Sequence, residues 1–65
     1  MSETYVRLLE QQTIAEDNNL DFVDFVAYAM DAAMALEDLQ PSEISDTILD
    51  ILEKEIAFNL QENAK

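Results

Sequence analysis

Two short stretches determine where this chain can turn, because it contains no glycine and a single proline. Asn18 and Asn19 follow two acidic residues, and Asn tolerates the left-handed conformation that commonly ends a helix. Pro41 ends a second segment, since proline pushes the residue before it out of helical geometry. We therefore expect an all-α fold, a small three-helix domain over residues 1–65 with helices at about 3–16, 20–38 and 43–62. Ser2 and Ser42 are the predicted N-caps of the first and third helices.

The segment 20–38 holds the strongest helix formers of the chain and is predicted to be the central helix, contacted on more than one side. Alanines would let neighbouring helices approach it closely, and Met30 and Met34, one turn apart, are interpreted as core-filling residues. The alanines concerned are Ala29, Ala32, Ala33 and Ala35.

Apolar residues of the segment 43–62 form a stripe that spans roughly 200° of a helix, about twice the width needed to pack on one neighbour. Such a width predicts a second contact, within the chain or across a dimer. Two polar residues, Glu55 and Asn59, fall inside the stripe, where a polar residue can fix register or oligomeric state. Glu55 could instead pair with Arg7 or Lys54. The predicted dimer interface comprises Ile44, Ile48, Leu52, Glu55, Ile56 and Asn59.

The small size of the chain also favours association. Domains below about 70–80 residues rarely gain much stability from their core alone and commonly rely on disulfides, metals or oligomerisation. With no cysteine and no histidine, this 65-residue chain has neither a disulfide framework nor a zinc site. We expect a marginal monomer that is stabilised as a homodimer or by a partner.

Composition excludes several functions. Three Lys and Arg against 15 Asp and Glu give a net charge of −12, so the chain lacks the basic surface that binds nucleic acid directly. The absence of His, Cys and Gly leaves no Cys or His nucleophile, no phosphate-binding glycine loop and no complete calcium loop. We expect no enzyme activity, no catalytic residue, no cofactor and no metal. With no membrane-spanning run and no signal-peptide pattern, a cytoplasmic protein is expected.

Aspartates recur along the segment 17–38 at spacings that fall on one face of a helix, and no Lys or Arg lies between Arg7 and Lys54. From Asp21 to Asp38 this face would extend about 25 Å. The face is open to two interpretations, an ordinary solvated surface or an anionic ridge that contacts a partner. The predicted partner-binding residues are Asp17, Asp21, Asp24, Tyr28, Asp31 and Asp38.

These features predict a small acidic protein-binding module. We expect an inhibitor or modulator that presents its anionic ridge to a basic protein surface, such as one that binds nucleic acid. Its size and charge are similar to those of phage-encoded inhibitors that mimic DNA, although no motif is shared. The alternative is a helical adaptor or regulatory homodimer that binds through the apolar face of the segment 43–62.

Overall fold

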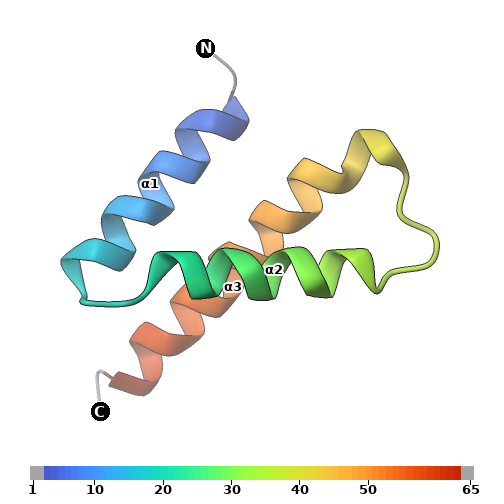
Figure 1. Ribbon diagram of the computed structural model, residues 1–65. Helices are drawn as coiled ribbons and strands as arrows, with labels where there is room; N and C mark the ends of the chain where they lie inside the picture. The colour runs from blue at the N-terminus through green and yellow to red at the C-terminus, as the bar shows by residue number, and fades with distance from the viewer. Residues whose placement is uncertain (1–2, 64–65) are drawn as a thin grey trace.

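A computed structural model describes residues 3–63 and confirms a small all-α architecture of three helices (Figure 1). Helix α1 covers Glu3–Asp17, α2 covers Phe22–Met34 and α3 covers Ile44–Asn63. A 3₁₀ turn, η1, covers Pro41–Glu43. Within the described residues no strand is present. The predicted cap Ser2 lies outside this range.

The first joint forms as the sequence predicts. Asn19 has a φ of 59°, so it adopts the left-handed conformation in place of the missing glycine. The N–H of Leu20 donates to the carbonyl oxygen of Ala15 at 2.8 Å, and the N–H of Asn19 donates to that of Glu16 at 3.3 Å. These two bonds define a Schellman motif. Asp21 then caps α2, because its side chain accepts a hydrogen bond from the N–H of Asp24 at 3.4 Å.

The second joint differs from the prediction, since α2 ends at Met34 and not near residue 38. Two acidic residues, Glu37 and Asp38, would lie at the negative end of an extended helix, where no basic residue compensates them. Gln40 is extended, with φ −80° and ψ 146°, as expected before Pro41. The prediction of Ser42 as an N-cap is also wrong, because Ser42 lies inside η1.

The central helix is α3, which corrects the assignment of that role to α2. In Figure 1, α3 crosses behind α2, and it packs most extensively on α2 and next on α1. The predicted width of its apolar stripe is therefore explained by two neighbours within one chain. Two small residues of α2, Ala29 and Ala33, are buried, as close packing requires. The buried core consists of Ala15, Ala29, Ala33, Leu49, Leu52 and Ile56.

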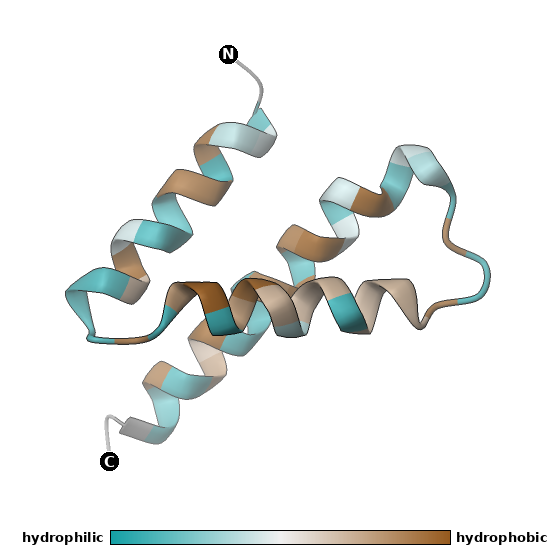
Figure 2. Cartoon of the chain, viewed as in Figure 1, coloured by the Kyte–Doolittle hydropathy of each residue, from teal (hydrophilic) through white to brown (hydrophobic). Residues whose placement is uncertain are grey.

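The resulting molecule is flat and open. Its extents are 37 × 28 × 16 Å, and its radius of gyration is 12.2 Å. A compact domain of this length would have a radius of gyration of about 10.7 Å. Figure 2 shows that α2 is hydrophobic along most of its length, whereas α1 and α3 alternate more evenly. Since α2 contacts its neighbours along one side, part of its apolar surface remains exposed.

Candidate protein-binding surface

The outward face of α2 carries the part of the predicted acidic ridge that lies within a single helix. Asp24, Tyr28 and Asp31 are all exposed and follow one another at spacings of four and three residues. At 100° per residue they fall within about 60° of the helix circumference. In the part of the chain that the structure describes, their side chains form no hydrogen bond or ion pair. The charges of Asp24 and Asp31 are therefore not compensated by any ion pair within residues 3–63.

The remaining predicted ridge residues do not share this face. Asp17 is the last residue of α1, Asp21 is the N-cap of α2, and Asp38 lies beyond the end of α2. The prediction of one helical row of about 25 Å is therefore wrong at both ends. The shared face, from Asp24 to Asp31, is about 10 Å long.

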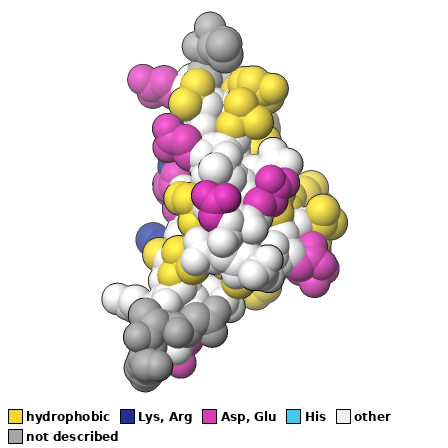
Figure 3. All heavy atoms as spheres, turned by 90° about the vertical axis from the view of Figure 1, so that its left-hand side faces the viewer, with side chains coloured by type: hydrophobic (Ala, Val, Ile, Leu, Met, Phe, Trp, Pro, Cys, Tyr) yellow, Lys and Arg dark blue, Asp and Glu magenta, His cyan; other side chains and the backbone are white. Residues whose placement is uncertain are grey.

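Other acidic side chains are distributed more widely. Figure 3 views the molecule from the side of α1 and the α1–α2 turn, and shows acidic side chains dispersed among apolar ones. Lys and Arg side chains are visible only at the edge of this face. The negative charge is therefore not confined to α2.

Helix α3 adds a carboxylate that the ridge prediction missed. Glu55 is half-buried and lines a shallow hollow of about 150 Å³ together with Asp24, Phe25 and Tyr28 of α2. The hollow thus combines two carboxylates with two aromatic rings, which is the chemistry that attracts a cationic side chain. The sequence could not reveal it, since the grouping depends on the packing of α2 against α3.

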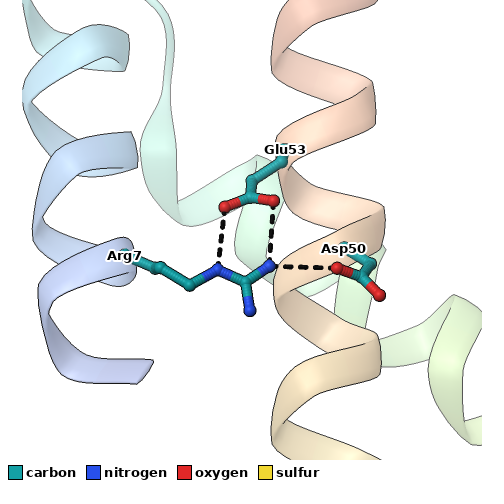
Figure 4. Close-up of polar contacts among 3 residues, drawn as sticks. All are labelled: Arg7, Asp50 and Glu53. Atoms are coloured by element: carbon teal, nitrogen blue, oxygen red, sulfur yellow. Dashed lines mark hydrogen bonds and ion pairs between the residues drawn. The ribbon is translucent and has the colours of Figure 1, made fainter. Parts of the chain in front are cut away.

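The alternative in which Glu55 pairs with Arg7 or Lys54 does not occur among the described residues. Figure 4 shows Arg7 of α1 between two other carboxylates of α3. Its Nε and one terminal nitrogen donate to the two oxygens of Glu53 at 3.1 and 2.9 Å, and the same nitrogen donates to Asp50 at 3.0 Å. These hydrogen bonds, first to Glu53 and then to Asp50, raise the pKa of the Arg7 guanidinium above its usual value.

This pairing makes the two flanks of α3 electrostatically different. Glu53 and Glu55 are two residues apart and therefore lie on roughly opposite sides of the helix. The flank toward α1 is partly neutralised by Arg7, whereas Glu55, on the flank toward α2, has no ion pair within residues 3–63. Uncompensated charge is thus placed beside the outward face of α2.

The residues predicted to form a dimer interface mostly serve the core of one chain. Leu52 and Ile56 are buried, Ile48, Glu55 and Asn59 are half-buried, and Ile44 is exposed. The large apolar residues that remain most exposed are instead on α2, where Val23 and Met34 stand out. Met30 is exposed as well, so the interpretation of Met30 and Met34 as core-filling residues is wrong.

Comparison of the chain with protein-family models, with curated proteins and with solved structures gives no match. Within residues 3–63, no three acidic side chains are grouped so that they could hold a metal ion. None of the helices in that range combines the length and apolar character needed to cross a membrane. The outward face of α2, with Glu55 beside it, combines exposed carboxylates with the aromatic rings of Phe25 and Tyr28.

Proposed function

We propose that this chain is a small acidic protein-binding module that inhibits or modulates a basic partner, such as a nucleic-acid-binding protein. The observation that carries the proposal is the exposed, unpaired group formed by Asp24, Tyr28 and Asp31 on α2, with Glu55 of α3 beside it. Its action is binding, and it needs no catalytic group, cofactor or metal. A cytoplasmic location and occupation of the partner's nucleic-acid site belong to the same proposal.

The physical basis is electrostatic steering followed by local pairing. A net charge of −12 accelerates encounter with a basic surface, and the effect falls as salt screens it. At contact, the carboxylates of Asp24 and Glu55 can each accept hydrogen bonds from Lys or Arg side chains. Tyr28 lies between the two exposed aspartates and adds an aromatic face on which a guanidinium can stack.

The test is a charge reversal confined to the shared face. The double variant Asp24→Lys/Asp31→Lys leaves the Asp21 cap intact, so α2 should still form. Immobilised wild-type protein and this variant are compared for capture of partners from the source lysate at about 50 and 300 mM salt. We expect wild type to retain a basic protein at the lower salt only. The variant should lose it by a factor of about 100 or more, as fits reversal of two close charges.

A matched control separates the ridge from total charge. Glu10→Lys/Glu62→Lys makes the same change in net charge at two exposed sites on α1 and α3. This control should retain most of the binding. Equal loss in both variants would show that net charge alone drives association. Release of the captured protein by added duplex DNA would support competition for a nucleic-acid site, and retention would refute that part of the proposal.

A further inference from the structure

The outward side of α2 carries an apolar strip directly beside the acidic face. Val23, Ala27, Met30 and Met34 lie within about 60° of the helix circumference, on the side of the exposed aspartates that leads away from Glu55. Their large side chains are unusually open to solvent, with 73% of Val23, 44% of Met30 and 77% of Met34 exposed. Together with the exposed face of Asp24, Tyr28 and Asp31, this strip makes up the surface of α2 that α3 and α1 leave uncovered.

The spacing of the strip matches that of a helix–helix seam. Its members are separated by four, three and four residues, the 4-3-4 pattern of apolar positions in a coiled coil. From Val23 to Met34 the strip is about 16 Å long, or three helical turns. Two methionines supply flexible side chains that adapt to a partner surface.

A recess adjoins the strip. Met30 also lines an open apolar hollow of about 200 Å³ formed between the three helices. The other large side chains around it are Leu8, Val26, Ile48 and Leu49. A side chain from a helix docked on the strip could therefore enter this hollow, which would anchor the helix as well as cover α2.

The charge beside the strip indicates which kind of helix can dock on α2. A second copy of this chain would bring a net charge of −12 against −12, and an antiparallel helix pairing would place the rows of Asp24 and Asp31 opposite one another. A helix with Lys or Arg beside its apolar positions would be attracted and not repelled, because each carboxylate of α2 would then face a cation. Charge complementarity thus favours a basic amphipathic helix and disfavours self-association through this strip.

We infer that the strip formed by Val23, Ala27, Met30 and Met34 is a docking seam for a basic amphipathic helix of a partner protein. The inference rests on the proposed function, since it specifies the element of the basic partner that α2 contacts. The apolar seam supplies affinity that persists in salt, and the adjacent acidic face sets the charge and orientation of the bound helix.

The test uses two synthetic helical peptides of about three heptads. The seam peptide has Leu at 4-3-4 spacing with Lys on both flanks, and the charge-only peptide has Gln in place of every Leu. Binding to wild-type protein is measured by fluorescence anisotropy at about 150 mM salt. Met30→Gln/Met34→Gln removes the apolar strip with little change in side-chain length, and Phe58→Gln is the control at an exposed apolar site on α3.

We expect Met30→Gln/Met34→Gln to weaken the seam peptide about tenfold and to leave the charge-only peptide unchanged. Phe58→Gln should alter neither. Unchanged binding of the seam peptide to Met30→Gln/Met34→Gln would overturn the inference, and the single variant Val23→Gln provides the same test should the double variant unfold. Asp24→Lys/Asp31→Lys reports separately on the proposed function, because it should weaken both peptides. A stable homodimer that Met30→Gln/Met34→Gln dissociates would assign the strip to a second copy instead.

Discussion

Truncation of Leu52 tests whether this thin core belongs to a monomer. Leu52 is 0% exposed, and among the residues whose burial the structure describes, it and Ile56 are the two large side chains that are essentially completely buried. A buried Leu→Ala change costs about 3–5 kcal/mol, with the smaller losses at sites that can collapse around the cavity. The molecule is only 16 Å thick in one direction, so its helices can move in to fill part of the cavity. We therefore expect a loss near the lower limit, about 3 kcal/mol, for Leu52→Ala.

A loss of about 3 kcal/mol is most of the free energy of unfolding expected for a domain of this size. A core of this size supplies about 3–5 kcal/mol, so about 1 kcal/mol would remain in the variant. The ratio of folded to unfolded molecules would then be roughly five to one at 25 °C. With a urea slope of about 1 kcal/mol per molar, the unfolding midpoint should fall by about 3 M.

The assay is urea unfolding followed by far-ultraviolet circular dichroism at about 5 and 200 µM protein. Because Leu52 is buried by its own chain, the wild-type midpoint should not depend on concentration. Phe58→Ala, at a residue that is 59% exposed, should shift the midpoint by less than about 1 M. A midpoint that rises with concentration, together with a Leu52→Ala loss that shrinks at high concentration, would restore Leu52 to a dimer interface and refute the reasoning.

Three further predictions use the same unfolding assay. Asn19→Gly should stabilise the fold by up to about 1 kcal/mol, because glycine adopts a positive φ without strain. Asn19→Val should destabilise it by more than that, because a β-branched residue is strained at positive φ. Equal urea midpoints for the two variants would contradict the left-handed geometry of residue 19. Arg7→Met should lower the urea midpoint more than Lys54→Met, since Arg7 bonds to Asp50 and Glu53 while Lys54 has no ion pair within residues 3–63. For the wild type, raising sodium chloride from about 10 to 300 mM should increase the midpoint, because salt screens the self-repulsion of a chain with net charge −12; a fall would show that attractive pairs dominate.

Local signals in the sequence predicted the helices well because they act over a few residues. An asparagine pair without glycine was sufficient to predict the first joint, and Asn19 confirms it with a φ of 59°. Pro41 indicated the second joint but not its length, since a proline restricts only the residue before it. The early end of α2 depends on Glu37 and Asp38, whose unfavourable position at a helix C-terminus competes with a high helix propensity upstream.

The arrangement of the helices was harder to predict, because an apolar stripe does not identify its neighbour. The wide stripe of α3 was compatible with a dimer, yet α1 and α2 cover most of it within one chain, and Ile44 and Phe58 remain exposed. The same packing places Glu55 beside Asp24 and exposes Met34, and neither relation has a signal in the sequence spacing alone. Of the predicted site, the row formed by Asp24, Tyr28 and Asp31 is the part whose shared helical face the structure reproduces.

The thin core and the exposed strip lead to a coupled prediction. Apolar side chains such as Met34 add little to folding while they face water, but a helix that covers them binds the folded state alone and stabilises it by mass action. At about 100 times its dissociation constant, the seam peptide should add about 2.7 kcal/mol to the free energy of unfolding. It should therefore recover most of the stability lost in Leu52→Ala, whereas the same concentration of charge-only peptide should recover less. The seam peptide could instead bind and leave the urea midpoint of Leu52→Ala unchanged. That result would mean that the peptide binds folded and unfolded chains equally, and it would refute the strip as a binding surface that exists only in the folded chain.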